Sequence, residues 1–189
     1  MAHRIALLVT AFLLVACMHS RWSVVRQEAP NPFSTQTTFA IEPIHFEAMT
    51  VSGGTEAQFL TTKNDDLKNL WQSDKKEMSA TYVERMSTDP FVHAMVITPE
   101  KPADPKAYVL RLSITQLEPG SFAGVVVEAT DVRATLQVLA PGSGKVLDEI
   151  RLRASVPAGA TSPSTGGRLR SAASELARQT SEYIASRVR

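Results

Sequence analysis

The stretch DVRATLQVLAPGSGKVLDEIRLRAS, residues 131–155, decides the fold, because apolar and polar residues alternate on both sides of one turn. The apolar positions are Val132, Ala134, Leu136 and Val138 before the turn, and Val146, Ile150, Leu152 and Ala154 after it. A period of two places such residues on one face of a half-buried strand. The segment APGSGK, residues 140–145, carries the proline and glycines of a tight turn. We therefore expect an antiparallel hairpin with one face against a core.

Two further segments extend this pattern toward the N-terminus. Residues 107–117 alternate clearly, with Tyr108, Leu110, Leu112 and Ile114 on one side and Arg111, Ser113 and Thr115 on the other. Residues 122–139 form a long predicted strand in which Val125, Val127 and Ala129 are out of register with Val132 and its successors. A change of parity implies a bulge or a break, which we expect near Glu128–Thr130.

Two shorter strands precede these. Residues 39–46 (FAIEPIHF) alternate weakly and contain Pro43, which cannot donate to a ladder, so we expect an edge strand or a bulged one. Residues 91–98 (FVHAMVIT) are apolar on both faces. This is typical of a strand buried on both sides, or of one with an interface on its outer side.

Helical periodicity covers residues 56–87 and 168–189. Asn64-Asp65-Asp66 could cap a second helix, so the first segment is one helix or two split near residue 63. The second segment has a continuous apolar stripe: Leu169, Ala172, Ala173, Leu176, Thr180, Tyr183, Ile184 and Val188. The glycine- and proline-rich loop before it, residues 156–167, is mobile by composition. The order predicts a two-layer α+β domain: a mixed, mostly antiparallel sheet of about five strands with two main helices on one face.

Composition excludes several classes of protein. The 189 residues are 43% hydrophobic and 21% charged, which are ordinary globular values. The formal net charge of +1 gives no electrostatic case for binding nucleic acid. The single cysteine excludes an intrachain disulfide framework and a cysteine-rich zinc site.

The first residues read as a targeting segment. Ile5–Val15 (IALLVTAFLLV) is too short to span a membrane but fits the apolar region of a signal peptide. It ends in Leu14-Val15-Ala16-Cys17, which resembles the bacterial lipobox. The resemblance implies cleavage before Cys17, a diacylglyceryl group on its sulfur and acylation of the new amino terminus. The alternative is a plain secretory signal that happens to contain a cysteine.

Lipidation at Cys17 would define three parts of the chain: a signal peptide at 1–16, a lipidated flexible tether at 17–38 and a single periplasmic domain at 39–189. The part from Cys17 onward has 19 basic and 19 acidic residues, so its net charge is zero. The tether would reach at most about 70 Å. Trp22 would either lie at lipid headgroups or dock on the domain. Met18, rather than Asp, looks like an outer-membrane address, with the inner membrane and the cell surface left open.

A search for sites returns few candidates. His45 and His93 are not in a ligand-spaced cluster, so we expect packed, hydrogen-bonded histidines and no metal or cofactor. The segment GSGKV, residues 142–146, lacks the pattern of a phosphate loop and lies in the expected hairpin. The segment SGGT, residues 52–55, is a break that could offer amides to an anion. Arg111, Arg133, Arg151 and Arg153 are expected on the outward sheet face, as a salt-bridged surface or an anion patch.

With these features together, the chain resembles small Gram-negative envelope lipoproteins. These include the auxiliary lipoproteins of ABC-type lipid-transport systems and several uncharacterised families. The residues that carry the resemblance are the lipobox, the strand at 107–117, the hairpin with Gly144-Lys145-Val146-Leu147 and the final helix. It implies a protein that acts by binding and transfers no functional residue except Cys17. We expect a non-enzymatic accessory subunit with a protein partner in the envelope. The alternatives are a carrier or sensor of a small amphiphile, which needs an apolar cavity between helices and sheet, and an envelope hydrolase.

Overall fold

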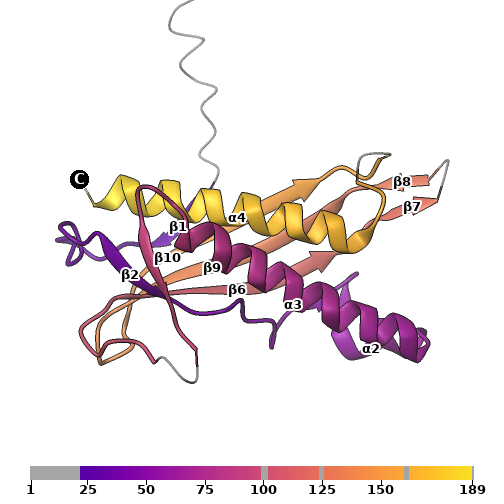
Figure 1. The fold of residues 1–189 in the computed structure, drawn as a ribbon, viewed down its shortest axis with the longest axis horizontal. Helices are drawn as coiled ribbons and strands as arrows, with labels where there is room; N and C mark the ends of the chain where they lie inside the picture. Colours follow the sequence, from indigo (N-terminus) through magenta and orange to yellow (C-terminus); the bar gives the residue numbers. More distant parts are fainter. Residues whose placement is uncertain (1–21, 99–101, 124–125, 160–161, 189) are drawn as a thin grey trace, which may run out of the picture.

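A computed structural model describes residues 22–98, 102–123, 126–159 and 162–188 (Figure 1). The strands are β1 (Trp22–Arg26), β2 (Thr38–Ile41), β3 (Thr50–Val51), β4 (Gly54–Thr55), β5 (His93–Val96), β6 (Val109–Glu118), β7 (Ser121–Ala123), β8 (Val126–Glu128), β9 (Thr130–Leu139) and β10 (Val146–Val156). The helices are α2 (Glu56–Thr61), α3 (Asp65–Ser87) and α4 (Thr165–Arg187). Cys17, the expected lipidation site, lies outside the described residues.

The main sheet has the order β1-β10-β9-β6-β2-β5, and β3 pairs with β4 and β6. Its centre is antiparallel: β9 pairs with β10 and with β6, and Leu152 lies opposite Ala134 in the predicted hairpin. Among the strands that the structure describes, the parallel pairs are β2 with β5, β2 with β6 and β3 with β6. The expected two-layer α+β fold is therefore confirmed, with a mostly antiparallel sheet and helices on one side.

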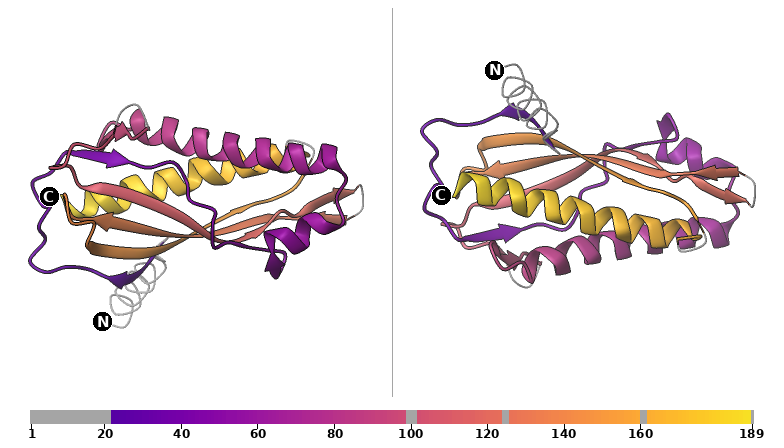
Figure 2. Two further views of the ribbon diagram at one scale, coloured as in Figure 1. Left: turned by 90° about the horizontal axis from the view of Figure 1, so that it is seen from below. Right: turned by 90° about the horizontal axis from the view of Figure 1, so that it is seen from above.

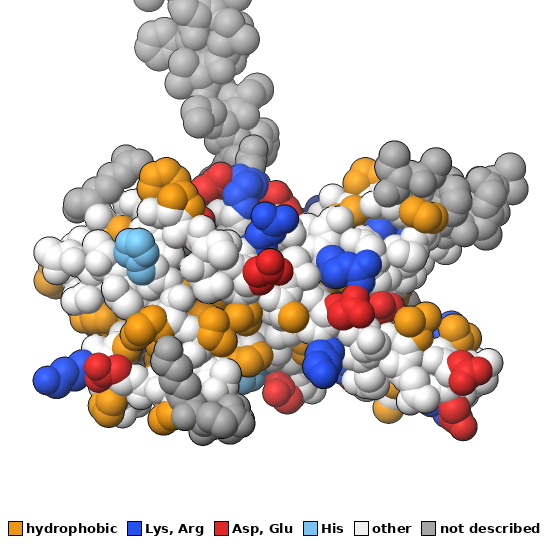
Figure 3. All heavy atoms as spheres, viewed as in Figure 1, with side chains coloured by type: hydrophobic (Ala, Val, Ile, Leu, Met, Phe, Trp, Pro, Cys, Tyr) orange, Lys and Arg blue, Asp and Glu red, His pale blue; other side chains and the backbone are white. Residues whose placement is uncertain are grey.

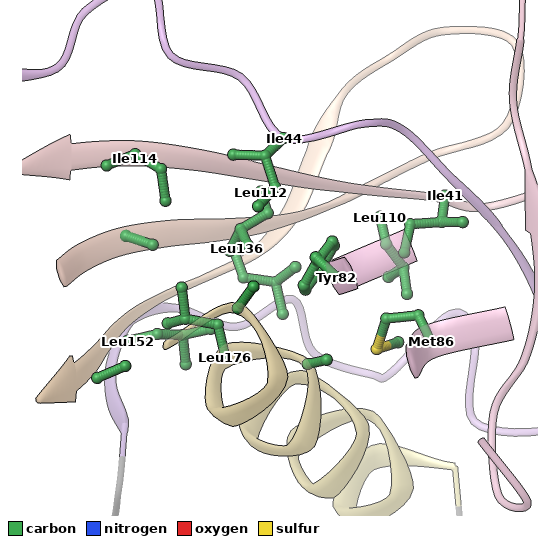
Figure 4. Close-up of a cluster of buried hydrophobic side chains, with 14 of the residues drawn as sticks. Ile41, Ile44, Tyr82, Met86, Leu110, Leu112, Ile114, Leu136, Leu152 and Leu176 are labelled. Carbon is green, nitrogen blue, oxygen red and sulfur yellow. The ribbon is translucent and has the colours of Figure 1, made fainter. Parts of the chain in front are cut away.

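Two long helices cover one face of this sheet and run parallel to each other (Figure 2). The Tyr82 hydroxyl of α3 donates to Thr180 Oγ1 of α4 at 3.3 Å. Beneath them, inward side chains of the strands, such as Leu110, Leu112 and Leu136, interlock with Tyr82, Met86 and Leu176 (Figure 4). The predicted stripe of α4 is buried, except for Val188, which is half-buried.

The helical segment at 56–87 is two helices, which settles the open alternative. Thr55 and Gln58 form a capping box at the start of α2. The Asn64 side chain accepts from the Leu67 amide at 2.9 Å and starts α3. Both ends follow from short polar side chains that satisfy amides of the first turn.

Two strand predictions were wrong in their details. The segment at 39–46 is not an edge strand: β2 ends at Ile41, before Pro43, and pairs with β5 on one side and β6 on the other. Of the two alternatives for the segment at 91–98, burial on both sides is wrong, and an interface on the outer side of the strand stays a prediction. Its strand β5 lies at the sheet edge, where Met95 is 42% exposed and His93 also faces solvent.

The predicted break near Glu128–Thr130 is confirmed. Upstream of it, the chain does not continue as one strand but forms a separate hairpin of β7 and β8. This hairpin extends beyond the main sheet at the end where α2 lies (Figure 1). The helix α4 begins at Thr165, three residues earlier than expected, because the Ser164 hydroxyl caps its first turn. Residues 160–161 of the preceding loop lie outside the described residues.

The prediction of a flexible tether at 17–38 was wrong for residues 22–38. Strand β1 pairs antiparallel with β10, with Trp22 opposite Leu152. The Trp22 ring meets the Tyr183 ring edge to face, with centroids 5.9 Å apart. Trp22 thus docks on the domain. Phe33 is fully buried, and the Arg187 guanidinium lies 5.5 Å from the centre of its ring.

The buried carboxylate of Asp148 holds this N-terminal segment in place. Asp148 is 1% exposed and accepts from the Glu28 amide at 2.9 Å, the Tyr183 hydroxyl at 2.6 Å and Arg187 Nε at 2.8 Å. Arg187 also donates to the Glu28 carbonyl at 3.0 Å. One carboxylate on β10 therefore joins the sheet, α4 and the segment before β2.

This arrangement predicts that the domain begins before residue 39. A fragment that starts at Thr38 lacks β1, the Glu28 contacts and the Phe33 ring. We expect its free energy of unfolding to be about 3–5 kcal/mol lower than that of a fragment starting at Trp22, from lost apolar burial and buried hydrogen bonds. Urea denaturation followed by circular dichroism measures the difference, and equal midpoints would restore the tether interpretation.

Candidate functional site

A groove of about 470 Å³ opens at the end of the molecule where α2 and the β7–β8 hairpin lie. We call it the overhang groove. It is lined by Ser52, Phe59, Lys63, Leu67, Leu70, Trp71, Asp74, Glu118, Pro119, Gly120, Glu128, Ala129 and Thr165. Its volume is within the range of sites that bind small molecules or inserted side chains.

The groove exists because the two parallel helices are offset: the first residues of α3 lie beyond the first turn of α4. Asp74 of α3 packs against Gly166 in the first turn of α4, and the ion pair between Arg170 and Glu77 lies one turn further on. Residues 65–73 therefore project past the start of α4. Helix α4 does not reach this overhang, and Leu67 and Leu70 are 48% and 55% exposed. Exposed leucines in a concave surface are typical of a binding site.

An aromatic pair forms the floor beside these leucines. The rings of Phe59 in α2 and Trp71 in α3 lie with centroids 5.0 Å apart, and Lys63 Nζ lies 5.0 Å from the centre of the Phe59 ring. The short connection between α2 and α3 folds the two helices against each other and brings these rings together. Trp71 itself is only 5% exposed.

Glu56 fixes the orientation of the tryptophan. Its Oε1 accepts from Trp71 Nε1 at 2.6 Å and pairs with Lys75 Nζ at 2.7 Å. Burial acts to raise the pKa of Glu56, but the hydrogen bonds from Lys75 and Trp71 outweigh it and hold the pKa below its usual value. Glu56 therefore stays ionised and holds the indole ring through its N–H.

Asp74 stands at the inner end of the groove. A Cβ added to Gly166 would lie 2.1 Å from Asp74 Oδ1, so glycine is what allows α3 and α4 to approach here. Burial, together with the nearby Glu77 charge, raises the pKa of Asp74, while Arg170 opposes the shift. This carboxyl group is one of the polar groups in the lining of the groove, together with Ser52 and Thr165.

The β7–β8 hairpin forms the opposite wall, and a buried arginine fixes its base. Arg168 is 1% exposed. It donates from Nε to Thr130 Oγ1 at 2.8 Å, from Nη2 to the Pro119 carbonyl at 3.1 Å and from Nη1 to the Pro163 carbonyl at 2.8 Å. Gly120 follows with a φ of 66°, and a Cβ there would meet the Glu128 carbonyl at 2.4 Å. Arg168, near the start of α4, therefore fixes the base of this wall through its hydrogen bonds.

Several site expectations from the sequence are tested by this geometry. His45 is hydrogen-bonded, as expected, with Nε2 2.9 Å from Glu42 Oε2, whereas His93 is exposed and not packed. Among the residues that the structure describes, no three His, Cys, Asp or Glu side chains gather as a metal site. Within the same residues, no helix has the length and hydropathy of a membrane span. The segment at 142–146 is the predicted hairpin turn between β9 and β10.

Three of the four arginines of the outward sheet face, Arg111, Arg133 and Arg153, form ion pairs, as the salt-bridged interpretation predicts. Arg111 Nε lies 2.5 Å from Glu42 Oε2. Arg133 and Arg153 share Asp131, at 3.7 and 2.7 Å. The overhang groove was not predicted from the sequence. Its local signal is the pair Leu67 and Leu70, which are part of the helical periodicity of residues 56–87.

Comparison with known proteins identifies the fold and not a family. The sequence matches no family model and no curated protein. Protein XCC0632 from Xanthomonas campestris, a DUF330 protein, has a TM-score of 0.50 at 11% identity, over 87% of this chain and 94% of that one. The chain shares its fold.

Two other solved structures are similar at lower scores. A PelC dodecamer from Paraburkholderia phytofirmans has a TM-score of 0.47 at 12% identity and covers 89% of this chain and 99% of its own. A minor lipoprotein from Acinetobacter baumannii has a TM-score of 0.38 at 15% identity, covering 78% and 90%.

The role of Arg168 predicts a strong effect of one substitution. Arg168→Met removes the guanidinium and leaves the Pro119 and Pro163 carbonyls without their donors in a buried space. We expect the free energy of unfolding to fall by about 3 kcal/mol. Arg170→Met, an exposed neighbour on the same helix, is the matched control and should change it by less than about 0.5 kcal/mol. Equal effects in chemical denaturation would contradict the role of Arg168.

Proposed function

We propose that this chain is a lipid-anchored bacterial envelope lipoprotein that acts as a non-enzymatic binding subunit. The observation that carries the binding role is the overhang groove with its exposed Leu67 and Leu70. The support for the anchor is the sequence Leu14-Val15-Ala16-Cys17 directly after an apolar segment. Residues 1–16 are then a signal peptide, and the domain lies on the periplasmic side of the outer membrane.

The occupant we propose for the groove is an apolar segment of a protein partner in the envelope. The groove is open to solvent, with Leu67 and Leu70 at its opening and charged residues, Lys63, Glu118 and Glu128, among its lining. An apolar centre with a polar rim is the usual anatomy of a protein interface. Aromatic residues such as Phe59 in the floor are typical anchors for an inserted side chain.

The alternative, a carrier or sensor of a small amphiphile, needs space between the helices and the sheet. That region is filled: Met78, Tyr82 and Leu176 are fully buried against the inward side chains of the strands (Figure 4). An acyl chain could still lie among the apolar residues of the overhang groove. A carrier that uses this groove and a protein-binding subunit are separated by one experiment.

The anchor is tested by Cys17→Ala. We expect the wild-type chain to take up a fatty-acid probe and to fractionate with membranes, because two or more acyl chains give stable anchoring. The Cys17→Ala chain should lose both properties. Ser20→Ala, a nearby polar position, is the control and should retain them. Unchanged labelling of Cys17→Ala would show that lipid is not attached there.

The groove is tested by photocrosslinking in intact cells. Benzoylphenylalanine at Leu70 should give an adduct with one defined protein, because this side chain lies in the groove opening. The control is the same group at Phe91, a 71% exposed residue that does not line the groove. It should give no adduct. An adduct with the mass of a lipid at Leu70 would favour the carrier. Equal crosslinking at both positions would contradict a specific groove.

A further inference from the structure

The structure shortens the link between Cys17 and the folded domain. Trp22 is already part of β1 and pairs with Leu152. Only residues 18–21 separate it from Cys17, so the two Cα atoms are at most about 17 Å apart. An acyl group on Cys17 would therefore hold β1 close to the bilayer surface. This inference rests on the proposed function, because it needs an anchor at Cys17.

Next to β1, the outward face of the sheet contains a hollow of about 760 Å³. Ser23, Arg133, Arg151 and Arg153 are in its lining, and we call it the arginine hollow. The strand register explains the cluster. Ser23 lies opposite Arg151, and Arg153 lies opposite Arg133, so all four residues project from the same face. Trp22 and Leu152, one position along, belong to the other face.

Positive charge dominates this hollow. Glu149 is the only acidic residue in the lining, and it accepts from Gln137 at 2.8 Å. Arg133 and Arg153 share the single carboxylate of Asp131. Arg151 is exposed, and no described carboxylate lies within 4.0 Å of its guanidinium. On the helical face, in contrast, basic and acidic side chains are interspersed (Figure 3).

We propose that the arginine hollow faces the membrane and binds the phosphate groups of anionic phospholipids. Guanidinium groups match phosphate oxygens in charge and geometry, and each basic residue near an anionic surface adds a favourable contribution. The outer face of the sheet then lies on the bilayer. The helical layer is turned away from it, since α3 and α4 cover the other face of the sheet (Figure 2).

The test uses the full chain anchored through Cys17 in vesicles, with phenylglyoxal as a reagent for accessible arginines. Peptide mass spectrometry reads the modification rate of each arginine in phosphatidylglycerol–phosphatidylcholine vesicles, in pure phosphatidylcholine vesicles and in detergent. We expect Arg133, Arg151 and Arg153 to react about fivefold more slowly in the anionic vesicles than in detergent. Arg85 and Arg170, exposed on the helices, are internal controls and should react equally in all three.

A double variant tests whether charge orients the domain. Arg151→Glu with Arg153→Glu should abolish the protection of Arg133, whereas Arg85→Glu should not. Equal rates for all arginines, protection of Arg85 instead, or equal protection in uncharged vesicles would overturn the proposal. Protection that persists in detergent and requires high protein concentration would indicate a second copy on this face, and would also overturn it.

The intact mass of the chain separates this result from the proposed function. If the mass shows no acyl groups, lipidation at Cys17 fails. The Cys17 thiol is then coupled to a maleimide lipid in the same vesicles, and the arginine rates are read in the same way. The membrane-facing hollow is thus tested whether or not the chain is acylated in cells.

Discussion

The position of the N-terminal segment against the sheet and α4 depends on the hydrogen bonds and the ion pair of the buried Asp148 carboxylate. A buried carboxylate is costly unless donors surround it. Asp148 on β10 meets that need by collecting the Glu28 amide, the Tyr183 hydroxyl and the Arg187 guanidinium from two other parts of the chain. The residues before β2 are therefore part of the domain and not a tether, and Cys17 lies within a few residues of the sheet.

A second buried charge, Arg168, has the same role at the opposite end. It satisfies carbonyl oxygens at the base of the β7–β8 hairpin and in the segment before α4. Together with the offset between α3 and α4, it shapes the overhang groove. The groove and the arginine hollow have no lining residue in common. Under our proposals, a partner protein and the membrane therefore contact separate surfaces and do not compete.

Local patterns predicted the central elements well. The alternation in residues 131–155 predicted the hairpin, and the parity change predicted the break before β9. Asn64 marked a possible start of a second helix, and the structure begins α3 there. The failures were long-range. Trp22–Arg26 has no informative period, and its partner strand β10 lies more than a hundred residues later in the chain. Pro43 suggested an edge strand, but β2 ends two residues before it and pairs on both sides.

By itself, the sequence determined the strands with one apolar face, the amphipathic helices, the capping residue Asn64 and the turn between β9 and β10. These features are encoded by neighbouring residues, because period, capping and turn geometry are properties of contiguous backbone. Only the tertiary structure decided the strand order, the position of β5 at the edge, the exposure of Leu67 and Leu70, and the proximity of Ser23 to Arg151. Helix packing decides which part of an apolar stripe stays exposed. It depends on where elements that are distant in the sequence begin and end in space.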